Sequence, residues 1–342
     1  MKIERNQLLN ELKMVEIGLS TQEKLEQSNC FVFQNGEVIT YNDEIASRVK
    51  SCLPITGAIN AKKMLDMLSK SNDDFIEFEF EKGKLFFRGK KKRGFFKIET
   101  KILLPTKDVE TPKKWKKLPS DFILAIGLVA ECSKSIADSI RLACVHFTSK
   151  LIEACDGVQA GRYEISIPFD KDILLKGETV KRIAKLKIQE VSITDNWIHF
   201  RNEIGLLLSC IIYVDKYPSD RLTEIFRVKG KPSTLPNKLK ELTERVRVFL
   251  DDDMSTQWLK VELTPTYIQV TGEGKYGKQT ERQKIKYEGE PIEFSINPEL
   301  LRILVEKHDC CRVSSKVIKI EKGKFQYVTS LWIPNVKIEE KT

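Results

Sequence analysis

Three glycines in the last third of the chain have the spacing of a phosphate-binding loop. Gly272, Gly274 and Gly277 fit G-x-G-x-x-G within the stretch VTGEGKYGKQ. In nucleotide-binding folds such glycines let the backbone approach a pyrophosphate, which the N-terminus of a following helix stabilises. The next residues, QTERQKIKYEGEP, have no apolar side chains at helical spacing and contain a Gly-Glu-Pro break. We therefore predict a flexible turn between strands and no bound cofactor.

Other residue types that could do chemistry are isolated. The cluster His308, Cys310 and Cys311 is the nearest approach to a metal site, but it has no partner pair elsewhere and the chain has no C-x-x-C. His146, His199 and His308 stand near no hydrolase, metalloprotease or paired-carboxylate motif. We expect no metal and no catalytic residues, so the chain is not expected to be an enzyme.

Length and composition indicate a folded protein of the cytoplasm. The 342 residues are 41% apolar and 31% charged, which suits two or three domains with a sizeable core. Most of the eight cysteines lie in apolar runs, where a reduced thiol packs as a small side chain. We expect no membrane segment and no signal peptide. The excess of 58 Lys and Arg over 49 acidic residues, a formal charge of +9, favours a polyanionic partner.

The elements that would position these residues repeat three times along the chain. Residues 55–70, 172–187 and 292–307 each read as a short strand followed by a helix, with Asn60 and Asn297 as N-caps. Alternating strands joined by tight turns follow each helix, and the tetrad EKGK recurs in the first and third copies.

Each copy also opens with a helix and a hairpin. Apolar residues at helical spacing mark the opening helices at 5–19, 119–133 and 236–250. Only the third copy contains the glycine triplet, which is a second argument against a nucleotide site. The fold class is therefore α+β, with three repeated helix-sheet domains at residues 1–117, 118–228 and 229–342.

Three short stretches, taken in order along this repeat, resemble the bacterial sliding clamp, the beta subunit of DNA polymerase III. They are MKIERNQLLNEL at the start, EACDGVQAGRYEIS at 153–166 and CIIYVDKYPSDR at 210–221. The resemblance covers essentially the whole chain. It implies a DNA-clamp fold in which two chains associate head to tail into a closed ring, with helices lining the hole and sheets outside.

The resemblance implies a DNA polymerase processivity factor that encircles duplex DNA. About twelve helices, each about 10 Å wide, give a circle about 38 Å across, which leaves a duplex loosely held. Such a ring contacts phosphates through long basic side chains and reads no sequence. The resemblance also implies that the DNA polymerase and the clamp loader bind through short peptide motifs.

Basic residues on the helix faces opposite the apolar stripes would face the hole. Solvated helix faces of any protein carry such residues, and solvation also explains the basic runs at 89–94 and 112–117. Lys24 and Lys134 follow the opening helices of the first two copies, where the resemblance implies duplex contacts. The helix residues expected to face DNA are Lys13, Lys62, Lys63, Lys181, Arg182, Lys185, Lys238, Arg245 and Arg302.

The resemblance implies an apolar peptide groove between the middle and last domains. This chain departs from the family at residues 158–160, where family members carry a bulky residue, an arginine and an aliphatic residue. The departure indicates a divergent clamp and leaves a viral origin open. The same residues would alternatively be interdomain core. The expected groove residues are Leu142, Gly157, Val158, Gln159, Ala160, Leu331, Ile333 and Pro334.

The seam of the ring would pair an exposed edge strand of the first domain with one of the third. We place these edges at 95–104 and 256–263. Unpaired strand edges are aggregation hazards, so closure into a dimer would also remove a stability problem. The seam residues are Phe96, Ile98, Trp258 and Leu259.

Two other functions stay open at this point. One is a clamp-like scaffold that mainly recruits transcription or repair factors. The other, from a different class, is a nucleotide-dependent enzyme built on the glycine triplet.

Overall fold

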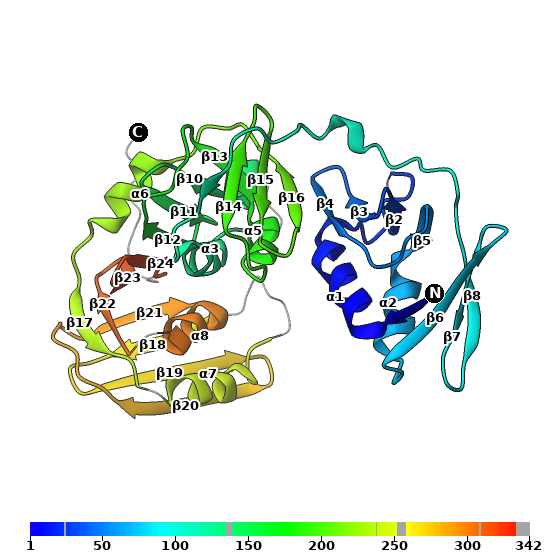
Figure 1. Ribbon diagram of the computed structural model, residues 1–342. Coiled ribbons are helices and arrows are strands. Elements are labelled where there is room, and N and C mark those ends of the chain that lie inside the picture. Colours follow the sequence, from blue (N-terminus) through cyan, green and yellow to red (C-terminus); the bar gives the residue numbers. More distant parts are fainter. Residues whose placement is uncertain (24, 135–138, 237, 252–257, 308, 333–342) are drawn as a thin grey trace. The chain divides into compact units, whose positions relative to one another are not determined.

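The computed structural model describes residues 1–342 except 24, 135–138, 237, 252–257, 308 and 333–342, and has an α+β architecture (Figure 1). The chain divides into two compact units. Unit 1 comprises Met1–Gly127, Phe147–Lys150 and Ser166–Asp215, and unit 2 comprises Leu128–His146, Leu151–Ile165 and Lys216–Thr342.

Unit 1 contains the first copy of the repeat and much of the second. The elements of the first copy are β1 (Lys2–Glu4), α1 (Arg5–Val15), η1 (Glu16–Gly18), β2 (Cys30–Gln34), β3 (Glu37–Tyr41), β4 (Ile45–Lys50), β5 (Gly57–Asn60), α2 (Ala61–Ser69), β6 (Phe75–Glu81), β7 (Lys84–Arg88), β8 (Arg93–Lys97), η2 (Thr106–Asp108) and β9 (Lys116–Lys117). They are followed by α3 (Phe122–Ala130), which runs to the unit boundary, and by β13 (Ile173–Lys176), α5 (Gly177–Ile183), β14 (Glu190–Ile193), β15 (Trp197–Arg201) and β16 (Leu207–Ile211).

Two sheets form in unit 1. One has the order β1-β6-β7-β8, and the other has the order β5-β2-β3-β4-β16-β15-β14-β9. In the second sheet β4 of the first copy pairs with β16 of the second, with Ser47 opposite Leu208. The sheet is therefore continuous from one copy to the next.

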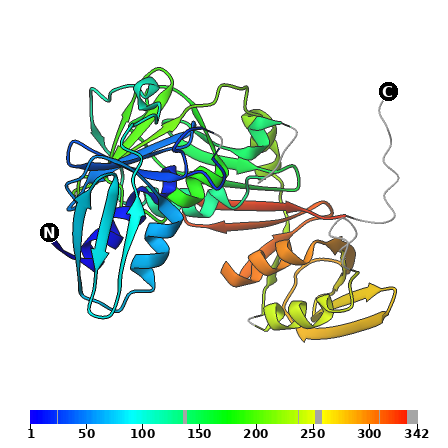
Figure 2. The ribbon, with the colours of Figure 1, turned by 90° about the vertical axis from the view of Figure 1, so that its right-hand side faces the viewer.

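Unit 2 contains the rest of the second copy and the third. Its elements are α4 (Ile140–Ala143), β10 (Cys144–Phe147), β11 (Leu151–Cys155), β12 (Gln159–Glu164), α6 (Ser219–Phe226), β17 (Lys231–Thr234), α7 (Leu239–Arg247), β18 (Leu259–Leu263), β19 (Tyr267–Gly274), β20 (Gly277–Lys284), β21 (Ile292–Ile296), α8 (Pro298–Lys307), β22 (Cys310–Val313), β23 (Val317–Lys322) and β24 (Phe325–Ser330). Strands β10-β11-β12-β24-β23-β22-β17 are neighbours in that order, and β20-β19-β18-β21 form a further sheet. The long β23–β24 hairpin is drawn in red in Figure 2.

Paired helices cover one face of the sheets in each copy. In the first copy α1 and α2 pack side by side, and in the third α7 and α8 do the same. In the second, a Cβ at Gly127 of α3 would lie 3.7 Å from Cβ of Ala184, directly after α5. The core of the first copy joins α1 and α2 to both sheets of unit 1 through side chains such as Leu8, Met64 and Phe31.

The predicted helix caps are confirmed. Asn60 Oδ1 accepts a hydrogen bond from Lys63 N at 3.1 Å at the start of α2, and Asn297 Oδ1 accepts one from Glu299 N at 2.8 Å at the start of α8. These bonds satisfy backbone donors that a helix N-terminus leaves free. The hairpin expected after the first opening helix is also confirmed: β2 and β3 are joined by an Asn-Gly turn, in which Asn35 and Gly36 have φ of 53° and 75°, the left-handed pair that tight hairpins require.

The glycine triplet has a packing explanation. A Cβ at Gly272 would lie 1.9 Å from the carbonyl oxygen of Val246, and one at Gly274 would lie 2.5 Å from that of Phe249. The two glycines lie inside β19 and allow α7 and the residues that follow it to approach this strand closely. The turn itself is Lys275 and Tyr276, with Gly274 opposite Gly277. The prediction of a turn is thus correct for its last residues, and Gly272 is a strand residue.

One expectation about elements is wrong. The strand expected over 95–104 ends at Lys97, and Glu99 instead bridges Ala58 of β5. The segment 217–236 between the second and third copies contains α6 and β17, for which no element was expected. Among the described residues, no helix is long and apolar enough to cross a bilayer.

Candidate functional sites

Several residues expected to form the peptide groove lie in unit 2 where β12 meets β24. These strands are antiparallel, with Gln159 opposite Thr329 and Ala160 opposite Val328. Ser330 N donates to the carbonyl oxygen of Val158 at 2.9 Å and extends the pairing by one step. Residues that are about 170 positions apart in the sequence are therefore neighbours.

An aspartate turn projects Val158 outward. Asp156 Oδ1 accepts hydrogen bonds from Val158 N at 2.9 Å and from Gln159 N at 2.8 Å, and Gly157 has φ of +97°. A left-handed φ explains the glycine at this position. Val158 is 42% exposed, whereas Ala160 is buried. Of the Asp-Gly segment, the Val158 side chain is therefore the one open to a ligand.

The side chain of Gln159 is held by protein groups. Its amide nitrogen donates to Asp156 Oδ2 at 3.0 Å, and its amide oxygen accepts from Tyr327 Oη at 2.8 Å. Burial raises the pKa of Tyr327 well above its usual range, so the hydroxyl keeps the proton that it donates. The alternative of interdomain core therefore describes Gln159 and Ala160 well.

An exposed tryptophan lies beside this segment and was missed by the sequence reasoning. Trp332 is 57% exposed, and its backbone pairs with Ser295 of β21 at 3.1 and 2.7 Å. The neighbouring Leu331 is half-buried, as is Leu142. The apolar run LWIP was the available signal, since alternate residues of an extended segment point to opposite sides. Ile333 and Pro334 lie outside the described residues.

The basic residues expected to face DNA differ in their exposure and in whether another protein group binds their charge. Lys13, Lys62, Lys63, Lys134, Lys185 and Lys238 are exposed. The others have protein partners: Lys181 Nζ pairs with Glu178 at 3.0 Å, and Arg182 donates to the carbonyl oxygen of Glu16 at 3.0 Å. Arg245 pairs with Glu281 at 2.5 Å, and Arg302 pairs with Glu299 at 2.9 Å. Lys24 lies outside the described residues.

Arg182 differs most from the expectation. Burial lowers its pKa, partly offset by the charge of Glu16, and its guanidinium binds the backbone at the end of α1. It therefore ties α5 to α1 inside unit 1. A guanidinium held in this way is less available to a phosphate than an exposed lysine.

Comparison with solved structures matches this fold along nearly its whole length. The DnaN sliding clamp (DNA polymerase III subunit beta) from Bartonella birtlesii shares 13% identity, with 97% of this chain and 99% of that chain covered and a TM-score of 0.83. The DNA polymerase III beta subunit from Thermotoga maritima shares 14% identity, with 97% and 98% covered and a TM-score of 0.80. The Pseudomonas aeruginosa clamp shares 14%, with 97% and 99% covered and a TM-score of 0.80.

This chain has the fold of the bacterial beta sliding clamp. The resemblance found in the sequence is confirmed at the level of fold, with three domain-like sheet units and low sequence identity. No family model matches the sequence, and no curated protein matches it. Among the described residues no group of three or more His, Cys, Asp and Glu could hold a metal ion, and His308 lies outside them.

One of the two edge strands expected to form the seam is not at the edge of its sheet. β8 is an edge strand, but β18 is paired on both sides, by β19 and β21, so placing an edge at 256–263 is wrong. Ile98 and Leu259 are buried, while Phe96 is half-buried and Trp258 is 39% exposed. The free edge of that sheet beyond β19 is β20, whose alternating polar sequence GKQTERQK gave no apolar signal.

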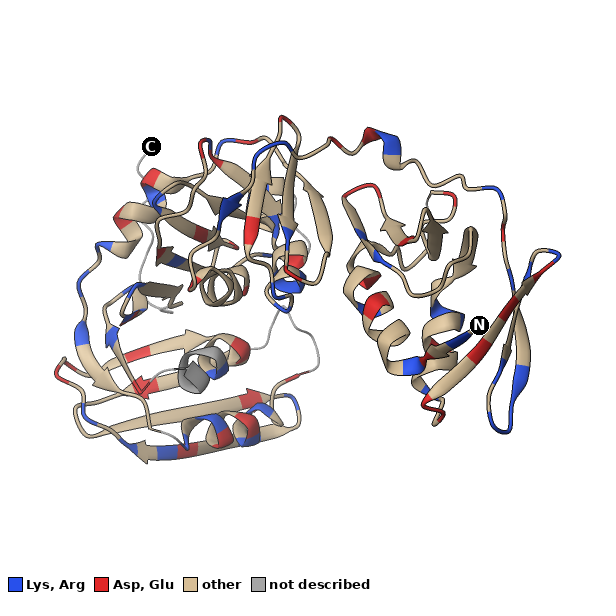
Figure 3. Ribbon diagram, in the orientation of Figure 1, with Lys and Arg blue, Asp and Glu red and all other residues tan. Residues whose placement is uncertain are grey.

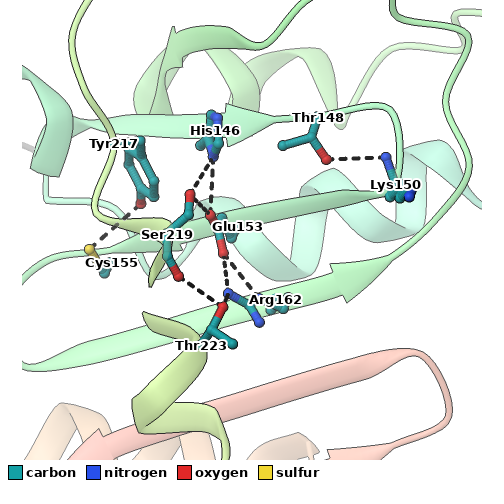
Figure 4. A network of polar contacts seen from close by, with 9 residues as sticks. All are labelled: His146, Thr148, Lys150, Glu153, Cys155, Arg162, Tyr217, Ser219 and Thr223. Carbon is teal, nitrogen blue, oxygen red and sulfur yellow. Dashed lines mark hydrogen bonds and ion pairs between the residues drawn. The ribbon is translucent and has the colours of Figure 1, made fainter. Parts of the chain in front are cut away.

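A buried polar network attaches α6 to the sheet of unit 2 (Figure 4). Arg162 Nη2 pairs with Glu153 Oε2 at 2.7 Å, and Ser219 Oγ of α6 donates to Glu153 Oε1 at 2.5 Å. His146 Nδ1 lies 3.1 Å from the same oxygen. Burial alone would raise the pKa of Glu153, but the hydrogen bonds of His146 and Ser219 and the charge of Arg162 outweigh it and lower the pKa. The Glu153 carboxylate is thus ionised and hydrogen-bonded on both oxygens. We infer that it stabilises the attachment of α6 to the sheet and takes no part in binding a ligand.

Proposed function

We propose that this chain is a DNA sliding clamp, a non-catalytic processivity factor that encircles duplex DNA in the cytoplasm. The observation that carries the proposal is the match of nearly the whole chain to solved sliding clamps, among them one with a TM-score of 0.83. A partial match would support only a shared domain. Coverage of 97% of this chain and 99% of the other supports the same arrangement of three domains, at 1–117, 118–228 and 229–342.

The ring would form from two chains joined head to tail, helices inside and sheets outside. We place the seam between β8 of one chain and β20 of the other, since each is an edge of a four-stranded sheet. Pairing them would continue the two sheets across the subunits, as β4 with β16 and β12 with β24 already continue them within the chain. Closure would also leave no exposed edge at this position.

Duplex DNA would be held by enclosure and by exposed lysines. Lys13, Lys62, Lys63 and Lys185 of unit 1, with Lys134 and Lys238 of unit 2, are the residues that we assign to phosphate contact. Flexible lysine side chains suit loose, sequence-independent contacts, because each is a mobile point charge.

Polymerase and clamp loader would bind through short peptides at the β12–β24 junction. Val158, Leu142, Leu331 and Trp332 offer apolar contact area, and Trp332 supplies a large ring. Such a site suits a peptide with one or two aliphatic or aromatic anchors. Gln159 and Ala160 support this surface from within.

The mass and shape of the particle in solution test the proposal. Light scattering after size exclusion should give twice the mass of the 39.4 kDa chain. Projection images should show a closed ring of six similar lobes around a central hole. A compact monomer, or a dimer without a hole, would contradict the proposal.

A further inference from the structure

The outer face of the β7–β8 hairpin carries an exposed aromatic pair. Phe86 and Phe95 lie directly opposite each other, with ring centroids 5.7 Å apart, and are 38% and 47% exposed. Their neighbours Phe87 and Phe96 point to the other side and pack against the core. Apolar packing therefore explains one aromatic pair of this hairpin and leaves the other unexplained.

Like charges face each other on both sides of this pair. Lys84 is opposite Lys97, and Arg88 is opposite Arg93, on the same face as the exposed rings. Hydrogen bonds from Ile98 N to Gly83 O and from Gly89 N to Lys92 O fix the bonded positions of the ladder. By alternation the two cation pairs fall at non-bonded positions, where side chains come closest.

Like-charge pairs at such positions destabilise a sheet. Lys84 Nζ lies 4.7 Å from the centre of the Phe95 ring. In the part of the chain that the structure describes, no ion pair is formed by Lys97, Arg88 or Arg93. An anionic ligand would relieve this repulsion. Figure 3 shows Lys and Arg positions of this hairpin in blue.

We propose that this surface, the Phe86–Phe95 platform with its four flanking cations, binds single-stranded nucleic acid. Bases stack on exposed aromatic rings while cations track the phosphates, and the combination needs no base sequence. Successive outward rows of a strand are roughly 7 Å apart, so cation, ring and cation rows alternate over about 13 Å. A single strand repeats charge and flat ring in the same alternation.

The shape and borders of the surface also fit this ligand. A hollow of about 810 Å³ is lined by residues that include Phe86, Arg88, Arg93 and Phe95. Glu77 and Glu79 of the neighbouring strand β6 also line this hollow, with Glu77 directly opposite Arg88. These carboxylates would confine a polyanion to the β7 and β8 side of it. An acidic peptide would satisfy the charges, but it would not need two open aromatic faces.

This inference goes beyond the proposed clamp and does not depend on ring closure. The platform lies on the sheet face opposite the core that α1 and α2 cover. A strand bound there would be separate from any duplex held by the helices. Pairing at the β8 edge would leave the face open, because edge pairing uses the backbone.

Fluorescence anisotropy of a labelled twenty-residue oligothymidylate tests the platform, with a duplex of equal length as comparison. The F86A/F95A variant should bind the single strand at least about fivefold more weakly, with duplex affinity unchanged. Tyr276→Ala is the matched control, since Tyr276 is 88% exposed beside Lys275 but lacks flanking cation rows. Thermal unfolding should be the same in all these proteins.

The charges are tested by the salt dependence of the same measurement. R88S/R93S should lower the slope of log K against log salt by about 1.4, and the control K101S/K107S, which removes two exposed lysines of the same unit, should leave it unchanged. Equal single-strand affinity in F86A/F95A and the unaltered protein would overturn the proposal. Binding of a glutamate-rich peptide in place of the oligonucleotide, lost in the same variants, would also overturn it.

Discussion

Tyr327 Oη donates a hydrogen bond to Gln159 Oε1 at 2.8 Å, between two buried residues that belong to different copies of the repeat. The bond lies where β12 and β24 join the second and third domains into one sheet. It fixes Gln159 so that the preceding residue, Val158, stays on the surface. The pairing of β12 with β24 and the exposed Val158 beside it together define the peptide site that we propose.

Peptide binding should depend on Val158 and Trp332 and not on exposed apolar residues elsewhere. The V158D/W332A variant should bind a partner peptide with apolar anchors at least about tenfold more weakly. Side chains at the centre of such a site each contribute about 2 kcal/mol to binding. Calorimetric titration measures the loss. Val214→Asp, at a residue 95% exposed in unit 1, is the control and should bind normally. Equal weakening by both changes would argue against a site at this junction.

The Glu153 network should make the protein sensitive to acid. The folded-state pKa of Glu153 is lowered, so its contribution to the free energy of unfolding is present above the ordinary pKa of 4.5 and is lost as pH falls through the lowered value. Glu153→Gln should lower the free energy of unfolding at pH 7 by about 3 kcal/mol, because it leaves Arg162 buried without a charge partner.

Urea unfolding from pH 7 to pH 3 measures this effect. The variant should lose less stability than the unaltered protein over the acid part of the range. Glu164→Gln, at an exposed residue on the neighbouring strand β12, should behave like the unaltered protein. A parallel fall of both curves with pH would assign the acid sensitivity to other groups.

The seam is open to a test at β20. Thr266 O accepts from Ile285 N at 3.0 Å, so by alternation the N–H of Thr280 points away from β19. Proline is tolerated at such an edge position in an isolated sheet but removes a donor from a paired edge. Thr280→Pro should therefore convert the dimer to monomer, with only a small fall in melting temperature from the lost hydrogen bond between the Thr280 and Thr271 hydroxyls.

The neighbouring residue provides the control for the seam. The N–H of Gln279 points toward β19, so Gln279→Pro should lower the melting temperature instead. Light scattering and thermal unfolding on both variants separate the two effects. A fully dimeric Thr280→Pro protein would place the seam elsewhere.

Exposed lysines, unlike paired arginines, should set the salt dependence of duplex binding. K62S/K63S should reduce the slope of log K against log salt by about 1.8, since each lost phosphate contact removes about 0.9. Arg245→Ser should change the slope little, because Arg245 already pairs with Glu281. Anisotropy titrations of a short duplex at salt concentrations from about 50 mM to about 200 mM give the slope for each variant. Identical slopes in all three proteins would remove α2 from the contact surface.

Much of the fold could be predicted because its signals are local. Asn60 and Asn297 mark helix starts, and the Asn35-Gly36 turn marks a hairpin, each through a bond or a φ that depends on a few adjacent residues. Repetition of these signals at a regular spacing predicted three domains. The short helix α6, Ser219–Phe226, was missed because its 8 residues are too few to show a clear helical repeat of apolar side chains. Prolines on both sides of it, Pro218 and Pro232, are typical of a loop.

The sites were harder to predict because they depend on distant partners. The sequence does not show that Arg182 would find the carbonyl of Glu16, or that Gln159 would meet Tyr327. Strand order is equally non-local, so Leu259 was placed at an edge although two strands flank it. Trp332 could have been recognised from the apolar run that contains it.

Retention on circular DNA tests the central claim most directly. Protein assembled on a nicked circular duplex, with a clamp loader if the ring does not open unaided, should stay bound in high salt during gel filtration. It should be released when a single cut linearises that DNA, because an enclosing ring slides off a free end. Equal loss from circular and linear DNA as salt rises would show that contact, and not enclosure, holds the protein.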